Sequence, residues 1–271
     1  METPTLLGNR EVTADLVEIS SYLPVPGHGV LPVNAFVIKG KEPVLIDTGL
    51  AVLHEPFLEA LGSIVDIDDI RWIWLSHLDA DHVGNLISVL ERAPSARVVT
   101  NFLGMGKMML AGLPTDRARL LDPGSRLELG DRELVPLRPP YYDAPETMGF
   151  FDTRSRVLFA ADAFGALLPA PAESAGAIAD DILRDGMIGW SAIDAPWLQQ
   201  LDRGCFARSL SAVERLAPTA LICGHLPAAA ENVQRRLVGH LTAAYRAGPV
   251  DGPSREEIER LISECRAPTA A

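Results

Sequence analysis

One stretch decides how this chain folds: Ser76-His77-Leu78-Asp79-Ala80-Asp81-His82. It ends the run RWIWLS at residues 71–76, whose aromatic and β-branched side chains are typical of a buried strand. From residue 83 onwards the apolar residues recur at helical spacing. A loop between a strand end and a helix start collects side chains and backbone N–H groups at one edge of a sheet. The stretch therefore predicts an α/β unit with a functional loop at that edge.

The loop carries four potential metal ligands at positions i, i+2, i+4 and i+5, namely His77, Asp79, Asp81 and His82. An aspartate here could simply cap the following helix, but capping explains only one of the four. Two imidazoles and two carboxylates directly after a buried strand favour a metal site.

Length and charge limit the class of protein. The chain has 271 residues and a formal net charge of −12, from 36 acidic and 24 basic side chains. This length suits one large domain, which buries enough surface to fold without a structural metal. Nucleic-acid binding requires clustered Lys and Arg, and the basic residues here occur only in short groups. The composition therefore argues against a nucleic-acid partner.

The cysteines and the N-terminus favour a cytoplasmic protein. Cys205, Cys223 and Cys265 form no CxxC pair, and their number is odd, so no disulfide framework is expected. Residues 1–20 lack the basic region and apolar core of a signal peptide, and no apolar run approaches 18 residues. We therefore expect no contact with a membrane.

The rest of the chain alternates short apolar runs with helical patterns, so we expect one α/β domain over residues 1–271. Residues 33–47 predict an opening hairpin, and residues 148–160 a second one. A helical insertion or lid is expected at about 166–200, and a C-terminal helix over 254–266, which begins with a capping box.

The metal loop resembles that of the metallo-β-lactamase superfamily, whose usual pattern is His-x-His-x-Asp-His, with Asp79 in place of the second histidine. Asp47-Thr48-Gly49, Asp162 and His225 agree with other superfamily positions in order and spacing. The resemblance covers about residues 15–245. It implies a four-layer αβ/βα sandwich, with two mixed β-sheets flanked by helices and the metals at one edge.

Two further motifs resemble the diiron branch, which comprises the flavodiiron proteins and stand-alone oxygen-binding diiron proteins. That branch carries His-x-Glu-x-Asp-His in the loop, so a carboxylate at Asp79 fits it. Residues 141–148, YYDAPETM, resemble its third-ligand motif, and residues 161–165, ADAFG, resemble its Asn-Asp-Ala-Phe-Gly.

The chain departs from the branch at two positions. Asp143 stands where the branch has a histidine, and Asp79 is shorter than the usual glutamate. Asp143 could ligate directly or through water, or could leave one metal under-coordinated, and Glu146 could replace it if the loop shifts. A carboxylate at this position is also similar to the diiron β-hydroxylases built on this fold.

The resemblance implies a ligand set of seven side chains for two metal ions. One ion would be held by His77, Asp79 and Asp143, the other by Asp81, His82 and His225, with Asp162 bridging the two. Hard carboxylates mixed with imidazole suit iron, and zinc or manganese is the alternative. His82 could instead lie in the outer shell of the site.

Other side chains are candidates for supporting roles. Asp47 is expected to orient a ligand. His28 lies in a loop before the first hairpin, where the family has the border of its metal cleft; it could be a general acid or substrate contact, or an exposed loop histidine. Trp190 and Trp197, in the insertion, could cover the site.

The expected function is binding of dioxygen or nitric oxide, followed by its reduction or its use to oxidise a substrate. Only about 25 residues follow residue 245, so we expect no flavodoxin-like domain and an external electron donor. The alternative is a hydrolase of an ester, lactone, thioester or phosphodiester that uses a metal-bridging hydroxide. A third possibility is a non-catalytic oxygen sensor. The oligomeric state is not readable from the sequence.

Overall fold

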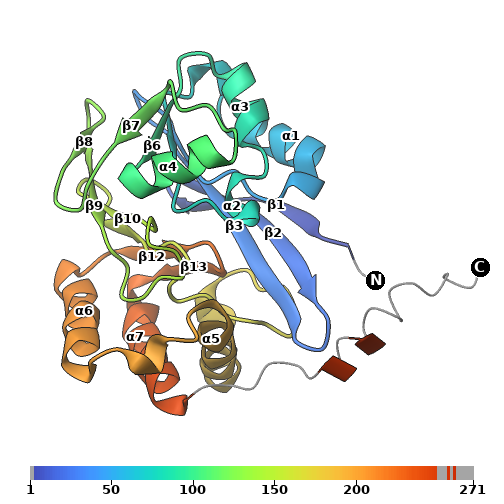
Figure 1. Cartoon of the computed structure of the whole chain (residues 1–271), viewed down its shortest axis with the longest axis vertical. Coiled ribbons are helices and arrows are strands. Elements are labelled where there is room, and N and C mark those ends of the chain that lie inside the picture. Colours follow the sequence, from blue (N-terminus) through green and yellow to red (C-terminus); the bar gives the residue numbers. More distant parts are fainter. Residues whose placement is uncertain (1–2, 249–254, 257–258, 261–271) are drawn as a thin grey trace, which may run out of the picture.

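Two β-sheets pack face to face in the computed structural model, which describes residues 3–248, 255–256 and 259–260 (Figure 1). The first sheet contains, in spatial order, β1 (Thr5–Thr13), β2 (Leu16–Val25), β3 (Gly29–Ile38), β4 (Val44–Ile46), β5 (Trp72–Trp74), β6 (Arg97–Thr100) and β7 (Ala118–Leu120). The second contains, in spatial order, β13 (Leu226–Ala230), β12 (Ala220–Cys223), β11 (Val157–Phe159), β10 (Gly149–Asp152), β9 (Glu133–Leu137) and β8 (Leu127–Glu128).

Helices cover the outer face of each sheet, at opposite ends of the view in Figure 1. The first group comprises α1 (His54–Ile64), α2 (Ala80–Val83), α3 (Leu86–Arg92) and α4 (Phe102–Leu110). The second comprises α5 (Asp180–Asp194), α6 (Arg203–Leu216) and α7 (Glu231–Ala247). Single 3₁₀ turns form at Ala51–Leu53, Ile67–Asp69, Ala175–Ala177 and Leu198–Gln200.

Both sheets are mixed. In the first, β1 to β4 pair antiparallel, whereas β4 to β7 pair parallel. In the second, β11 and β12 form the parallel pair and the other neighbours are antiparallel. Parallel neighbours require crossover segments, and helices such as α1 and α3 supply them in the first sheet. The carboxyl ends of β4, β5 and β6 therefore meet at one edge.

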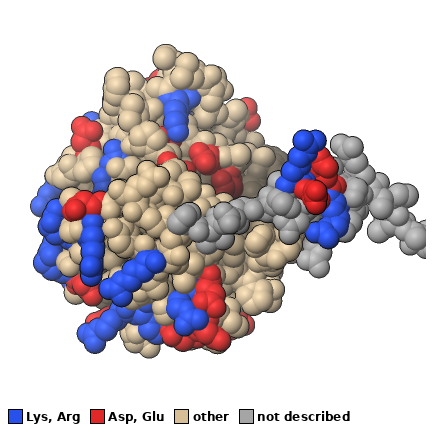
Figure 2. Space-filling view, turned by 60° about the horizontal axis from the view of Figure 1, so that its bottom comes forward, with Lys and Arg blue, Asp and Glu red and all other residues tan. Residues whose placement is uncertain are grey.

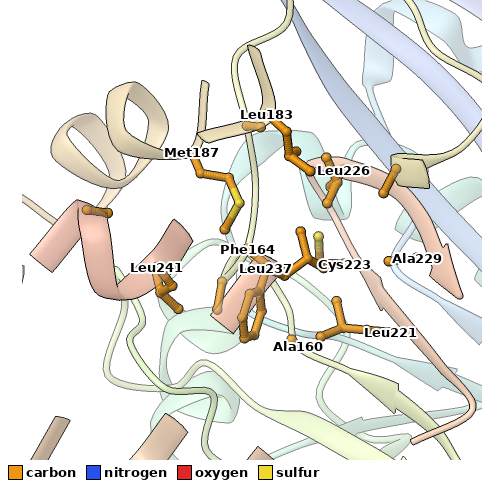
Figure 3. Close-up of a cluster of buried hydrophobic side chains, with 14 of the residues drawn as sticks. Ala160, Phe164, Leu183, Met187, Leu221, Cys223, Leu226, Ala229, Leu237 and Leu241 are labelled. Carbon is orange, nitrogen blue, oxygen red and sulfur yellow. The ribbon is translucent and has the colours of Figure 1, made fainter. Parts of the chain in front are cut away.

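Three apolar clusters fill the spaces between the four layers. Between the sheets, the rings of Trp74 and Phe150 lie 4.9 Å apart and those of Phe36 and Phe159 6.2 Å apart. A second cluster joins the first sheet to α1 and α3. In the third, side chains of α5 and α7 pack onto β12, as Leu183, Met187 and Leu237 do in Figure 3. The expected αβ/βα sandwich is thus confirmed.

The hairpin expected at residues 33–47 is formed by β3 and β4, but it does not open the fold, because β1 and β2 precede it. Polar residues in β2 interrupt its apolar pattern. Glu18 is fully buried; it pairs with Arg10 at 3.3 Å and accepts a hydrogen bond from Ala228 N at 3.1 Å. A strand whose buried positions include a charged side chain is hard to recognise by alternation alone.

The expected insertion at 166–200 contains α5, preceded by irregular chain. Residues 255–256 and 259–260 are helical, and the remainder of the helix expected at 254–266 lies outside the described residues, as does Cys265. Cys205 and Cys223 are free thiols. The single-domain organisation stays a prediction.

Surface charge is mixed where α5 and α7 meet the solvent. Acidic and basic side chains lie beside one another on the face turned forward in Figure 2. Arg236 pairs with Asp180 at 2.8 Å, and Arg184 pairs with Asp185 at 2.8 Å. Within the described part of the chain, no helix combines the length and the apolar character that crossing a bilayer requires.

Candidate metal centre

The predicted ligands come from four segments that meet at one edge of the two sheets. The loop between β5 and α2 carries His77 and Asp79, and the short helix α2 carries Asp81 and His82. Asp143 lies in the connection from β9 to β10, Asp162 follows β11, and His225 occupies the two-residue turn between β12 and β13. Segments up to 148 residues apart in sequence thus place their polar side chains together.

Each of the three histidines uses its Nδ1 for a protein contact. His82 Nδ1 lies 2.9 Å from Asp47 Oδ2, His225 Nδ1 lies 2.7 Å from the carbonyl oxygen of Pro32, and His77 Nδ1 lies 3.0 Å from Ser76 Oγ. The three Nε2 atoms are buried and make no hydrogen bond with any described residue. Three imidazole nitrogens are therefore free to bind a cation, with their ring orientation set from the other side.

Asp162 lies at the centre of the three rings. Its carboxylate oxygens are 3.2 Å from His225 Nε2, 3.3 Å from His82 Nε2 and 3.5 Å from His77 Nε2, and the residue is 4% exposed. Donors bound to one ion about 2.1 Å away lie about 3.0–3.4 Å from one another. The spacing around Asp162 fits donor atoms that share metal ions.

The other carboxylates divide into two groups. Asp81 lies 3.4 Å from His82 Nε2 and 3.5 Å from His225 Nε2. On the other side, Asp143 lies 3.7 Å from His77 Nε2, and the exposed Asp79 completes a group whose ligand atoms lie within 4.8 Å of one another. The two groups correspond to the two ion positions expected from the sequence, although the roles of the individual residues stay predictions.

The charged side chains of the site shift one another's pKa values. Burial opposes ionisation of Asp162, but the imidazoles of His225, His82 and His77 outweigh it and hold its pKa well below the usual range. Burial also opposes protonation of His225, yet Asp162 and Asp81 raise its pKa to about 9. Asp162 is therefore ionised, and a metal has to displace the proton of His225.

Asp47 supports His82 from a left-handed backbone conformation, with φ of 56°. Its Oδ1 accepts a hydrogen bond from Ser76 N at 2.8 Å, and its Oδ2 accepts one from Ser76 Oγ at 2.7 Å. Because the same Oδ2 faces His82 Nδ1, the proton of the neutral ring is placed on Nδ1 and Nε2 keeps its lone pair. This geometry fits the orienting role expected for Asp47.

On the other side of the centre, one residue has a left-handed backbone conformation and one glycine lies very close to two proposed ligands. Ala161, next to Asp162, has a φ of 49°. A Cβ on Gly224 would lie 2.9 Å from His82 Cε1 and 3.1 Å from Asp162 Oδ1. Strain of this kind persists only where surrounding contacts impose it, and it is common at functional sites.

Asn34 of β3 positions the last histidine, a role that the sequence analysis missed. Its side-chain amide donates to the carbonyl oxygens of Leu226 at 2.9 Å and Cys223 at 3.3 Å. These bonds cross from the first sheet to the β12–β13 turn and hold His225 in place. An asparagine within an apolar strand was the available signal.

Glu146, the alternative ligand, faces Lys107 instead. The Lys107 Nζ to Glu146 Oε1 distance is 2.5 Å, and Asn101 donates to the Glu146 carbonyl oxygen at 2.7 Å. Asp143 accepts a hydrogen bond from Thr147 Oγ1 through its Oδ1, at 3.2 Å, while its Oδ2 faces His77. The loop therefore presents Asp143, and not Glu146, to the centre.

The aromatic residues of the insertion differ in position. The Trp190 ring lies 4.5 Å from that of His225, and its Nε1 donates to the Asp162 carbonyl oxygen at 3.3 Å. A Cβ on Gly165 would lie 2.5 Å from Trp190 Nε1, so this packing requires glycine there. Trp190 thus covers the site, whereas Trp197 is 37% exposed.

His28 is exposed in the turn between β2 and β3, where it lines a surface hollow with Asp181 and Asp185 of α5. It belongs to none of the clusters of potential ligands found among the described residues. Its catalytic role stays a prediction.

Asp194, the last residue of α5, was missed by the sequence analysis. One of its oxygens lies within 4.8 Å of ligand atoms of both Asp143 and Asp162. Burial, together with the negative charges of Asp162 and Asp143, raises the pKa of Asp194 to about 8. The only sequence signal was its spacing, four residues after Trp190 in a segment expected to be helical.

Comparisons with known proteins find relatives of similar sequence. The chain is 35% identical over 144 residues to type A flavoprotein fprA of Rhodobacter capsulatus, covering 49% of this chain and 31% of that protein. It is 30% identical over 135 residues to putative diflavin flavoprotein A 2 of Nostoc sp., covering 49% and 23%. The matched part thus spans about a third or less of these relatives.

Solved structures share the fold. Rubredoxin oxygen:oxidoreductase from Desulfovibrio gigas aligns with a TM-score of 0.79 at 18% identity, over 94% of this chain and 68% of that one. The flavodiiron protein from Giardia intestinalis aligns with a TM-score of 0.77 at 14% identity, over 90% and 61%. The predicted resemblance to the diiron branch is confirmed. Residues 31–190 match the family model described as ODP family beta lactamase, and the chain belongs to that family.

Proposed function

We propose that the chain is a diiron protein that binds dioxygen or nitric oxide and reduces or activates it with electrons from an external reductant. The observation that carries the proposal is the convergence of three buried, unpartnered imidazole Nε2 atoms on the Asp162 carboxylate. The proposed ligands are His77, Asp79, Asp81, His82, Asp143, Asp162 and His225.

The donor set supports iron over zinc. It combines three imidazoles with four carboxylates, and hard oxygen donors mixed with imidazole suit non-haem iron or manganese. Two ferrous ions, when bound, supply electrons to dioxygen or nitric oxide. A solved neighbour, from Desulfovibrio gigas, is named a rubredoxin oxygen:oxidoreductase, which supports the same class of chemistry here.

The residues around the ligands protect and shape the centre. Asp47 keeps the His82 Nε2 lone pair directed inwards, and the Pro32 carbonyl oxygen does the same for His225. The Trp190 ring shields His225 from the side of α5. Burial of the three imidazoles and Asp162 keeps bulk water away from these donor atoms.

Anaerobic iron loading tests the proposal. Protein supplied with ferrous iron in the absence of air is expected to hold two irons per chain, and admission of dioxygen should produce a ferric absorption band. The matched control is the same protein loaded with zinc, which has no redox chemistry and should show no band.

Three other results would contradict the proposal. Two zincs per chain retained in preference to iron, with turnover of an ester or lactone panel, would identify a hydrolase. Reversible dioxygen binding without consumption of reductant would identify a sensor. Failure to bind any metal would remove the basis for all three functions.

A further inference from the structure

We propose that Asp194, from the insertion helix α5, is an additional metal ligand on the His77 side of the centre. The inference rests on the metal centre proposed above and extends it by one donor. The ion it would help to hold is a hard cation such as iron, because its donor is a carboxylate oxygen.

The last turn of α5 is anchored at the centre. Trp190 and Asp194 are four residues apart, so they lie on the same face of the helix. Trp190 donates to the Asp162 carbonyl oxygen at 3.3 Å and packs against His225. One turn earlier than Asp194, the helix is therefore already in contact with the segment that carries the bridging carboxylate.

The carboxylates of Asp143, Asp162 and Asp194 converge at this end of the helix, with one oxygen of each within 4.8 Å of the others. Like charges this close, away from bulk water, repel one another strongly. Asp194 Oδ2 is buried and makes no hydrogen bond to any described residue. A cation between the three carboxylates would satisfy this oxygen and remove the repulsion.

Neighbouring donors point into the same space and are also unpartnered. His77 is 1% exposed and Asp162 4% exposed, and His77 Nε2 and Asp162 Oδ1 make no hydrogen bond. The cluster is therefore more than a patch of acidic residues, because a buried imidazole nitrogen with a free lone pair is directed into it.

The balance of charge points the same way. Counting Asp194, five carboxylates surround three imidazoles, so acidic donors outnumber basic donors at the centre. The remaining donors on the His77 side are Asp143, which replaces the histidine of the resembling proteins, and the exposed Asp79. Asp194 would supply a further carboxylate oxygen on this side, and that oxygen, Oδ2, is buried.

Cobalt substitution tests the proposal, because the visible spectrum of bound Co²⁺ reports the ligands directly and does not depend on activity. The variants are Asp194→Ala and Asp194→Asn, the latter keeping the side-chain shape if the alanine variant fails to fold. The control is Asp185→Asn on the same helix, whose side chain is 66% exposed. Affinity is measured by competition with a chelator, and folding by circular dichroism.

We expect wild type and Asp185→Asn to bind two Co²⁺ with the same spectrum. Both Asp194 variants should lose about 10–100-fold in affinity for one ion, with a changed spectrum for that ion alone. Unchanged affinity and spectrum in the Asp194 variants, with two ions bound by wild type, would overturn this inference and leave the diiron proposal intact. Absence of metal binding in wild type would overturn both.

Discussion

The substitution Asp47→Asn should weaken metal binding because it changes the tautomer of His82, although it alters no proposed ligand. The Asp47 carboxylate accepts hydrogen bonds from Ser76 N and Ser76 Oγ and lies 2.9 Å from His82 Nδ1. In the variant, the amide oxygen can keep the bond to Ser76 N, which places the NH₂ group against His82. The ring then has to accept at Nδ1 and carry its proton on Nε2, the nitrogen that faces Asp162.

The magnitude follows from the role of such partners at metal sites. Loss of a carboxylate behind a ligating histidine typically costs about 10–100-fold in metal affinity, or about 1.4–2.7 kcal/mol. The stoichiometry should stay at two ions per chain, because every proposed ligand is still present. We therefore expect a weaker site with the same capacity.

Asp152→Asn is the matched control. Asp152 is 1% exposed, as is Asp47, and it also accepts three good hydrogen bonds, from Arg154 N at 2.9 Å, Ser155 Oγ at 2.6 Å and Arg132 Nη1 at 2.9 Å. Both variants remove a buried negative charge from its donors, so both should lower the free energy of unfolding by about 2–4 kcal/mol. Only Asp47→Asn should lower metal affinity.

The assay is chelator competition at fixed pH, alongside denaturant unfolding of the metal-free protein. Equal metal affinity in Asp47→Asn and wild type would refute the tautomer argument. Equal loss in Asp47→Asn and Asp152→Asn would show that affinity follows global stability and not the ring orientation.

Five further outcomes are expected. Asp162→Ala should lose both metals, since its carboxylate contacts all three imidazoles; a full complement by elemental analysis would disprove the ligand assignment. Asp143→His should keep two metals but change the visible spectrum and the reaction with dioxygen, and an unaltered spectrum would place Asp143 outside the ligand set. Against the effect of burial, the neighbouring carboxylates raise the pKa of His225 to about 9, so displacement of its proton should make metal affinity rise about tenfold per pH unit up to about pH 9, as a competition series would show. Because the folded-state pKa of His225 is raised, protonation of this ring stabilises the metal-free protein, fully so below the unfolded pKa of 6.5. This stabilisation is lost as the pH rises through 9, which unfolding curves at pH 6 and 9.5 would measure. Gly165→Ala should displace Trp190, whose Nε1 would lie 2.5 Å from the new Cβ, and its tryptophan fluorescence should differ from that of wild type.

The fold was predictable because its signals are local and repeated. The strand expected at residues 71–76 is present as β5, and the hairpins expected at 33–47 and 148–160 are present as β3–β4 and β10–β11. The β1–β2 hairpin was not recognised, since the buried Glu18 breaks the pattern and is satisfied only by partners far along the chain, Arg10 and Ala228 N. Local pattern carries no information about such a distant partner.

The site was predictable where ligands cluster in sequence or follow a strand end. The loop from His77 to His82 satisfies both conditions, and the structure brings Asp162 and His225 to it. Asn34 and Asp194 satisfy neither, because each acts across the fold, Asn34 through the β12–β13 turn and Asp194 through the last turn of α5. Their roles depend on tertiary packing, which a single sequence does not display.

The distribution of the ligands links metal binding to the stability of the whole sandwich. His77 and Asp81 follow β5 of the first sheet, whereas Asp162 and His225 follow strands of the second, so an ion bound to both sets joins the two layers. A cation that binds only the folded chain stabilises it by mass action, by about 2.7 kcal/mol at a free concentration one hundred times its dissociation constant. Metal removal should therefore loosen the edge where the sheets meet, while the apolar core around Trp74 and Phe150 holds the remainder together.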